Sequence, residues 1–353
     1  MLLHLSTASS ASDLEALRRV AAEKGYELRF LDRGRSVVEL VRESGPGKPG
    51  DRVAFEDLAC VLRVLDASEA PELHQRVPGR EDTVVRIGAA AFGGSSVSLI
   101  AGPCAVENEA HVLEIARAVR DAGATALRGG AYKPRTSPYS FQGLGPKGLE
   151  ILARVRAEVG LAILTEVLDP REVERVAAVA DALQIGSRSM SNVALLAEVG
   201  RCGKPVVLKR GLAATARELL LAAEHVLARG NRDVVLCERG VRGFDRVTRN
   251  VLDVGTVAHL KRVTHLPVIV DPSHAAGRPE LVLPLARAGL AAGADGLIVE
   301  VHVDRSRARS DAAQALTPAE FATLARSAAA LAQLDGRRLV VPEGVGDLAE
   351  ACP

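Results

Sequence analysis

Four side chains that can bind a metal ion stand at the ends of short aliphatic runs or in the loops that follow them. Cys104, His274 and Glu300 end or follow such runs, and Asp311 lies in the loop after Glu300. One thiol, one imidazole and two carboxylates form a mixed soft and hard ligand set, which suits Mn, Fe, Co or Zn better than Mg. A structural zinc site would instead use closely spaced Cys and His residues. The sequence therefore predicts one divalent metal ion per subunit, with an open position for Lewis-acid chemistry and with His302 as a rival to His274.

Six cationic side chains also stand at or just beyond the ends of aliphatic runs: Arg128, Lys133, Arg135, Arg188, Lys209 and Arg239. Fixed charges of one sign repel each other, so a cluster of them indicates an anionic ligand with more than one charged group. The guanidinium fork matches phosphate and carboxylate in bidentate fashion. A substrate with both groups, together with a second phosphate, would use this many cations.

Each of these residues has a simpler explanation when it is taken alone. An arginine at a strand end is commonly a surface ion pair, and Cys104 could be a small core residue. Glu300 could pair with Lys209, and Asp311 could be a solvated loop acid. These explanations lose force together, because all the positions fall on one rim of the expected fold.

The elements that would position this rim are eight aliphatic runs that alternate with helical stretches rich in Ala, Leu and Arg. This rhythm is typical of a TIM barrel or of a doubly wound sheet. No glycine-rich dinucleotide turn follows the first run, which favours the (β/α)8 barrel, whose sites lie at the carboxyl ends of the strands. The runs are Ser98–Ala101, Ala126–Arg128, Ala162–Glu166, Ala182–Gly186, Val206–Lys209, Val234–Cys237, Val268–Asp271 and Gly296–Glu300.

A smaller domain is expected before the barrel, over residues 1–67. A helix is expected over Ala11–Lys24, and a hairpin is expected to join Tyr26–Leu31 to Ser36–Val41. A second helix is expected over Phe55–Leu65, running into a last strand. This order of elements predicts a small ferredoxin-like α+β domain.

The remaining boundaries follow from composition. Residues 68–82 are polar and read as a linker, and residues 336–353 form a C-terminal tail. The barrel is expected over 83–335, and it begins with a hairpin of Thr83–Ile87 and Ser95–Leu99 around Gly93-Gly94. That hairpin could cover the bottom of the barrel.

Composition limits the function classes. The net charge is +1, so nothing global attracts nucleic acid or a membrane surface. The chain is 48% hydrophobic but only 3% aromatic, which indicates an aliphatic core. Five cysteines without a disulfide or CxxC pattern fit a reducing cytoplasm. No apolar run approaches the roughly 18 residues of a membrane span.

Several of these segments resemble the 3-deoxy-D-arabino-heptulosonate 7-phosphate (DAHP) synthases. The most specific match is LRGGAYKPRTSPYSFQGLG over residues 127–145, and AGPCAVE, QIGSR, LKRG, LCERG, VDPSHAAGR and IVEVH agree in order and spacing. The resemblance covers residues 83–330. It points to the type Iβ subfamily, whose members carry a ferredoxin-like front domain.

The resemblance implies a reaction and a role for each residue. The family condenses phosphoenolpyruvate with erythrose 4-phosphate and water, and its metal polarises the aldehyde oxygen. It assigns the metal to Cys104, His274, Glu300 and Asp311, and the phosphate of erythrose 4-phosphate to Arg135 and Thr136. Because Lys133 lies between the two expected anion sites, we expect it to act as a proton donor or relay, and Lys133, Cys104 and His274 are the expected catalytic residues. The remaining assignment concerns phosphoenolpyruvate, which would contact Arg128, Lys133, Arg188, Lys209 and Arg239.

Three other functions remain open at this point. The sister family, which makes 3-deoxy-D-manno-octulosonate 8-phosphate from arabinose 5-phosphate, typically has a KANRS-like loop, whereas this chain has Lys-Pro-Arg-Thr from Lys133. Metal-free members of that family replace the cysteine ligand by asparagine. A lyase or phosphatase could use the same phosphate rim, and a binding protein could have kept the barrel. Ser187, Ser189 and Ala312 depart from the family pattern without removing a proposed ligand.

Residues 1–67 carry none of the rim motifs, so the barrel does not obviously need them for chemistry. Their layout resembles small domains that pair across subunit interfaces and bind amino acids. We therefore expect a domain that senses an aromatic end product such as tyrosine or phenylalanine, in a homodimer or homotetramer. The alternative is a domain that only stabilises the oligomer.

Overall fold

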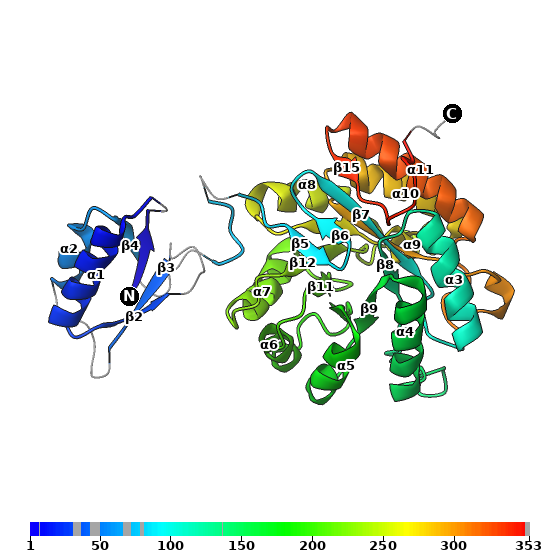
Figure 1. Cartoon of the computed structure of the whole chain (residues 1–353), viewed down its shortest axis with the longest axis horizontal. Coiled ribbons are helices and arrows are strands. Elements are labelled where there is room, and N and C mark those ends of the chain that lie inside the picture. Colours follow the sequence, from blue (N-terminus) through cyan, green and yellow to red (C-terminus); the bar gives the residue numbers. More distant parts are fainter. Residues whose placement is uncertain are drawn as a thin grey trace. The chain divides into compact units, whose positions relative to one another are not determined.

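The chain folds into two compact units, Met1–Gly79 and Arg80–Pro353 (Figure 1). The computed structural model describes residues 1–6, 8–30, 37–42, 50–65, 72–77, 81–135 and 137–349. Within these ranges no helix is both long and apolar enough to cross a membrane.

The first unit is a four-stranded antiparallel sheet with two helices. Its strands lie in the order β2-β3-β1-β4, so the first strand is central and the last is an edge strand. This order and the helix positions give the ferredoxin-like fold that the sequence predicts. The elements are β1 (Leu2–Leu5), α1 (Ala11–Glu23), β2 (Glu27–Phe30), β3 (Val37–Val41), α2 (Asp51–Glu56) and β4 (Val61–Leu65).

The local sequence explains α1 better than it explains the end of this unit. Ser10 and Asp13 form a capping box at the start of α1, and Leu17 lies fully buried on the face that meets the sheet. The second helix predicted over Phe55–Leu65 lies earlier in the chain, whereas the last strand into which it was expected to run is confirmed as β4. Helix α2 ends at Glu56, and Val61–Leu65 pairs with β1, because the exposed edge of the sheet offers hydrogen-bond partners to the β-branched residues of this stretch.

The second unit is a closed parallel barrel. Its eight strands are hydrogen-bonded in chain order, and the last pairs with the first. The (β/α)8 prediction is confirmed, and each strand overlaps the aliphatic run from which it was predicted. The strands are β7 (Ser96–Gly102), β8 (Ala126–Arg128), β9 (Ala162–Glu166), β10 (Ala182–Ile185), β11 (Val206–Lys209), β12 (Val234–Glu238), β13 (Val268–Val270) and β14 (Gly296–Glu300).

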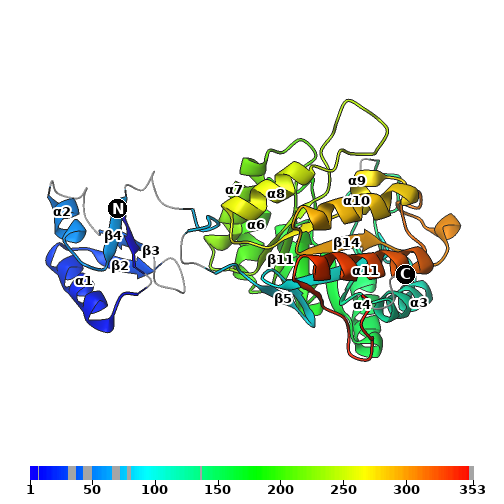
Figure 2. The same cartoon turned by 90° about the horizontal axis from the view of Figure 1, so that it is seen from above.

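Helices surround these strands, as Figures 1 and 2 show. The short helix α9 carries residues that follow β13 directly, and the short strand β15 (Arg338–Leu339) pairs with the start of β7. The helices are α3 (Glu109–Asp121), α4 (Pro146–Val159), α5 (Val173–Val179), α6 (Val193–Arg201), α7 (Ala216–Leu227), α8 (Val254–Val263), α9 (Pro272–Ala276), α10 (Pro279–Ala291) and α11 (Pro318–Leu334).

A two-stranded hairpin, β5 (Val85–Ile87) and β6 (Ala90–Phe92), precedes the barrel. The predicted partner for residues 83–87 was Ser95–Leu99, and this pairing is wrong. Ser96–Gly102 forms the barrel strand β7, because its aliphatic residues are buried there. The hairpin is closed instead by the tight turn after Ile87, which pairs β5 with β6.

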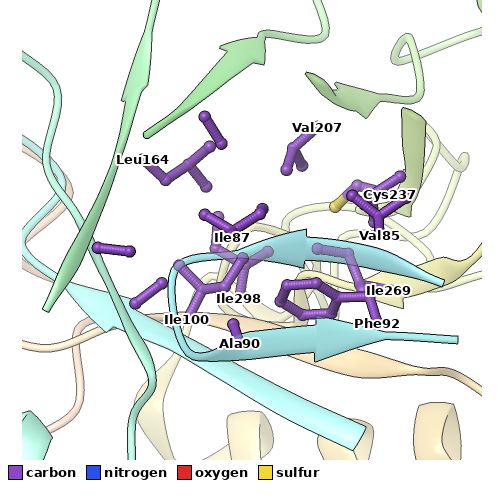
Figure 3. Close-up of a cluster of buried hydrophobic side chains, with 14 residues drawn as sticks. Val85, Ile87, Ala90, Phe92, Ile100, Leu164, Val207, Cys237, Ile269 and Ile298 are labelled. Atoms are coloured by element: carbon purple, nitrogen blue, oxygen red, sulfur yellow. The ribbon is translucent and has the colours of Figure 1, made fainter. Parts of the chain in front are cut away.

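This hairpin fills one end of the barrel. Figure 3 shows Ile87, Ala90 and Phe92 side by side with Ile100 and Ile298 of the barrel strands. Ser98 of β7 anchors the hairpin through its hydroxyl, which accepts from the Ala91 N–H at 3.0 Å and donates to the Ala91 carbonyl at 2.9 Å. The apolar hairpin therefore extends the core of the barrel at the end opposite to the carboxyl rim.

Replacing Phe92 by alanine should destabilise the barrel by about 3–5 kcal/mol, because its fully buried ring would leave a cavity among the barrel strands. Thermal unfolding followed by circular dichroism should show a clear fall in Tm. Phe244→Ala is the matched control, since the Phe244 side chain is fully exposed and its removal should change the Tm little. Equal Tm values for the two variants would contradict the role of the hairpin.

Candidate functional site

The closure of the barrel brings together side chains that lie far apart in the sequence of the second unit, near the first barrel strand and near the last two. Glu300 at the end of β14 lies opposite Gly102 of β7, two residues before Cys104. His274 follows the neighbouring strand β13 on α9, and Asp311 lies in the loop after β14. Three adjacent strands therefore deliver the four side chains to one point of the carboxyl rim.

The four side chains meet at short distances. The Cys104 thiol donates to Asp311 Oδ2 at 3.0 Å. His274 Nε2 lies 3.4 Å from Glu300 Oε1 and 4.0 Å from Asp311 Oδ2. The ligand atoms of Cys104, Glu300 and Asp311 all lie within 4.8 Å of one another. Among the described residues, the buried Glu300 Oε1 accepts no hydrogen bond, so this donor set fits a metal ion.

Asp271 fixes the orientation of the His274 ring. Its Oδ2 lies 2.8 Å from His274 Nδ1 and also pairs with Lys209. A proton on Nδ1 is therefore held by the carboxylate, which leaves the Nε2 lone pair free to face Glu300 and Asp311. Burial lowers the pKa of His274 and so favours the neutral ring that a metal ligand requires.

Burial and neighbouring charges act differently on the thiol, the ammonium and the carboxylate of this cluster. Burial raises the pKa of the Cys104 thiol to about 12. Burial opposes the charge of Asp311, but His274, Cys104 and Arg249 together hold the pKa of Asp311 below its usual range. Burial also opposes the charge of Lys133, yet Cys104 and Glu166 raise the pKa of Lys133, which therefore keeps its proton. Its ammonium donates to the Cys104 sulfur at 3.1 Å.

A cleft of about 510 Å³ opens beside this cluster on the carboxyl rim. His274 and Asp311 line it, together with eight cations and a single further carboxylate, that of Glu166. The cations are Arg128, Lys133, Arg135, Arg188, Lys209, Arg239, Arg242 and Arg249.

Several of these cations have N–H groups that no protein atom accepts. Within the described part of the chain, Nε and Nη1 of Arg128 and Nη2 of Arg135 are buried without a hydrogen-bond partner. Arg135 is held by its Nε, which donates to the Phe141 carbonyl at 2.9 Å. Buried donors of this kind are costly unless a ligand accepts from them, so the cleft is built for an anion.

Glycine at position 186 leaves room for the Glu166 side chain beside the cleft. A Cβ atom at Gly186 would lie 1.9 Å from Glu166 Oε1, so a side chain there would make the Glu166 carboxylate shift. Ser187 and Arg188 follow Gly186 and line the cleft. Gly186 thus allows the Glu166 carboxylate and the Arg188 guanidinium to share one wall.

The structure brings the four predicted metal ligands together and places the six predicted cations in the cleft. Thr136 lies outside the described residues. The suggested pair of Glu300 with Lys209 is not formed, because Lys209 pairs with Asp271 and Arg128 lies 3.1 Å from Glu300.

The rival ligand His302 lies in another group, with Glu107 and His111. Its Nδ1 accepts from the Asp304 N–H at 3.0 Å, so the neutral ring carries its proton on Nε2. That tautomer offers no free nitrogen lone pair to a metal ion, and His274 remains the imidazole of the cluster.

Sequence reasoning missed Arg242, Arg249 and Gln314. Arg249 donates to Asp311 Oδ1 at 2.8 Å and to the Gln314 side chain at 2.7 Å. The two arginines lie in the long loop between β12 and α8, beyond the strand-end positions at which the site residues were predicted. The concentration of arginine in that loop was the available signal, and Gln314 gave none.

Comparison with known proteins finds relatives among two kinds of aldolase. A phospho-2-dehydro-3-deoxyheptonate aldolase of Thermotoga maritima is 42% identical over 319 residues, which are 90% of this chain and 93% of the relative. A 2-dehydro-3-deoxyphosphooctonate aldolase of Syntrophotalea carbinolica is 35% identical over 252 residues, covering 66% of this chain and 90% of the relative.

Solved structures give the same grouping. The crystal structure of the Thermotoga maritima DAHP synthase matches with a TM-score of 0.74 and 39% identity, covering 96% of this chain and 98% of the other. A truncated form of the 3-deoxy-D-arabino-heptulosonate 7-phosphate synthase from the same organism matches with a TM-score of 0.70 and 41% identity, covering 76% of this chain and 98% of the other. The model of the DAHP synthetase I family matches residues 80–334, and the chain belongs to this family.

Proposed function

We propose that the protein condenses phosphoenolpyruvate with erythrose 4-phosphate and water to give 3-deoxy-D-arabino-heptulosonate 7-phosphate and phosphate. The observation that carries this proposal is a cleft with eight cations beside a Cys-His-Glu-Asp cluster, at the carboxyl rim of a DAHP-family barrel. Two anionic substrates would repel each other in water, and the cations both hold them and screen that repulsion.

The buried cations are assigned to phosphoenolpyruvate. Arg128, Lys133, Lys209 and Arg239 are each less than a tenth exposed, and the exposed Arg188 lines the same cleft. We assign the carboxylate and phosphate of phosphoenolpyruvate to these five side chains. The unpaired Nε and Nη1 of Arg128 support a planar, bidentate acceptor at that position.

The less buried Arg135 is assigned to the phosphate of erythrose 4-phosphate, together with Thr136. The free Nη2 of Arg135 and the neighbouring Ser137 and Ser140 of the cleft provide donors for a second phosphate. The two anions would then lie at different depths of one cleft.

The reaction joins C3 of phosphoenolpyruvate to the aldehyde carbon. A divalent metal held by Cys104, His274, Glu300 and Asp311 would supply Lewis-acid polarisation of the aldehyde oxygen. Lys133 is charged and lies against Cys104, so it can give the proton that the aldehyde oxygen gains. Water then adds at C2, and phosphate leaves with cleavage of the C–O bond. The surrounding arginines compensate the charge of the departing phosphate.

The second candidate is the synthesis of 3-deoxy-D-manno-octulosonate 8-phosphate from arabinose 5-phosphate. The 35% identity to the Syntrophotalea carbinolica relative is the observation that favours it. The Lys-Pro-Arg sequence from Lys133 and the higher identity to the heptulosonate relative favour the four-carbon aldose. Incubation of the protein with phosphoenolpyruvate and either aldose phosphate distinguishes the two, with turnover expected only for erythrose 4-phosphate.

Replacing Arg135 by alanine should raise the KM for erythrose 4-phosphate much more than the KM for phosphoenolpyruvate. One charge-assisted contact to phosphate is worth about 1.5–3 kcal/mol, so the increase should be on the order of tenfold to a hundredfold. Initial rates with each substrate varied in turn measure both constants. Arg171→Ala, which removes an exposed arginine paired with Asp169, is the control. Equal increases in both constants would show that Arg135 serves the other phosphate.

Metal binding should release about one proton, because the Cys104 thiol is protonated near neutral pH and binds a metal as thiolate. The apparent affinity should then rise by about tenfold per pH unit, since protons compete less well as the pH rises. Calorimetric titration of the EDTA-treated protein with Zn²⁺ or Mn²⁺, in buffers of different ionisation enthalpy, counts the protons. Chelation should also abolish turnover, and a divalent ion should restore it.

Cys202→Ser provides the control for this titration, since Cys202 lies outside the cluster. It should release the same proton as the unaltered protein, whereas Cys104→Ala should not. Full activity of Cys104→Ala without metal would refute the metal assignment.

We further propose that the ferredoxin-like unit is regulatory, in a homodimer or homotetramer, with tyrosine or phenylalanine as the effector. The unit has its own core around Leu3, Leu17 and Phe55, and the described residues that line the cleft belong to the second unit. Inhibition requires the effector to bind one arrangement of the units better than another, since equal affinity shifts nothing. A domain that only stabilises the oligomer remains the alternative.

Deleting the first unit should remove inhibition by aromatic amino acids while preserving turnover. The shortened chain would start near residue 83, and a truncated form of the Thermotoga maritima enzyme matches 76% of this chain. Rates of both forms with each amino acid at about millimolar concentration test this, because effector binding must favour one state to inhibit. A full chain that is indifferent to every aromatic amino acid would leave the stabilising role in place.

A further inference from the structure

Both carboxylates of the Cys-His-Glu-Asp cluster accept hydrogen bonds from one pair of side chains outside the cluster. Gln314 Nε2 donates to Glu300 Oε2 at 2.6 Å, and Arg249 donates to Asp311 Oδ1 at 2.8 Å. Arg249 also donates to Gln314 Oε1 at 2.7 Å, which joins the two contacts into one chain. Each carboxylate therefore has one oxygen committed to this chain.

The other oxygen of each carboxylate faces the centre of the cluster. Glu300 Oε1 is 3.4 Å from His274 Nε2 and 3.1 Å from Arg128 Nη2, and Asp311 Oδ2 accepts from the Cys104 thiol at 3.0 Å. The hydrogen bonds of Arg249 and Gln314 thus contribute to turning one oxygen of each carboxylate inward. A carboxylate fixed in this way can offer a single oxygen to a metal ion without rotating.

The backbone around Arg249 is itself fixed to the helix that carries His274. The N–H groups of Arg249 and Asn250 donate to the carbonyls of Ala276 and Ala275 at 3.1 and 2.9 Å. The Asn250 side chain donates to the His274 carbonyl at 2.8 Å. The loop between β12 and α8 therefore connects the His274 segment to the carboxylates of Glu300 and Asp311.

Asp311 shows why such support is needed. With φ of 52°, it is the sole residue other than glycine with positive φ among those that the structure describes. This conformation costs on the order of 1–3 kcal/mol and persists when its surroundings over-determine it. Arg249, Cys104 and Ser310 all contact the Asp311 carboxylate.

We propose that Arg249 and Gln314 are positioning residues that set the metal affinity of the site by orienting Glu300 and Asp311. This inference rests on the proposed metal site and assigns the β12–α8 loop a part in it. Arg249 brings a positive charge close to a cation, so charge alone would make it weaken metal binding. Orienting the carboxylates has the opposite effect and strengthens metal binding, since the loss of such outer contacts typically lowers metal affinity about 10- to 100-fold.

The test measures metal affinity rather than turnover. The full-length, EDTA-treated protein is titrated with Zn²⁺ or Mn²⁺ in competition with a chromophoric chelator. Arg249→Met and Gln314→Ala should each bind the metal about 10- to 100-fold more weakly. Arg249→Lys keeps the charge but lacks the fork, so it should restore only part of the loss. Arg246→Ala removes an exposed arginine of the same loop and should leave the affinity unchanged.

Two results separate this inference from the metal assignment. Unchanged or tighter binding in Arg249→Met, with the Tm of the metal-free protein unchanged, would overturn the role of Arg249 and Gln314. If Cys104→Ser and His274→Ala bind the metal as well as the unaltered chain, the metal site itself is misplaced. Should Arg249→Met fail to fold, Gln314→Ala provides the same reading, because it removes one neutral side chain from the network.

Discussion

The parallel pairing of β14 with β7 is the contact on which the site depends. It joins the last barrel strand to the first and sets Glu300 opposite Gly102. Close approach at this seam requires glycine at its start, because a Cβ atom at Gly296 would lie 2.3 Å from the Ser98 carbonyl oxygen and 2.9 Å from the Phe92 ring. The same few residues therefore close the barrel, seat the hairpin and bring Cys104 to Glu300.

Buried ion pairs give the rim its second constraint. Lys209 with Asp271, and Arg210 with Glu238, are almost entirely withdrawn from water. Removing one partner of such a pair typically costs about 3–5 kcal/mol, because the other charge is left uncompensated. Arg210 is absent from the cleft lining, so of two adjacent cations one faces the ligand and the other holds the loop. These two ion pairs keep the cleft cations in fixed positions before a substrate binds.

The barrel could be predicted from sequence because parallel strands buried on both faces are continuous aliphatic runs, as Val206–Lys209 and Gly296–Glu300 are. The ends of those runs then located Cys104, His274 and Glu300 on one rim. Asp311 came from the resemblance and from its place in the next loop. The ferredoxin-like unit was harder, because the edge strand β4 forms through its pairing with β1 rather than through local pattern.

The sequence did not predict the contacts that side chains of long loops make with the site. Arg249 lies well beyond the end of β12, and its side chain meets Gln314 and Asp311 only after the barrel has closed. The concentration of arginine in this loop does not single out Arg249, since an arginine in a polar loop usually faces solvent. The hairpin partner was misjudged for a related reason, because β7 was needed in the barrel sheet and could not also pair with residues 85–87.

The apolar hairpin packs Phe92 and its neighbours against the barrel strands, so the interior of the barrel is filled with apolar side chains. Two reactants and two products would then enter and leave at the carboxyl rim. Four of the cations assigned to phosphoenolpyruvate, Arg128 and Lys209 among them, are buried, whereas Arg135 is half-buried and Arg188 is exposed. With the assignments proposed above, a reactant held by the buried Arg128 and Lys209 would bind before one held by the half-buried Arg135. The two reactants would then bind in a fixed order.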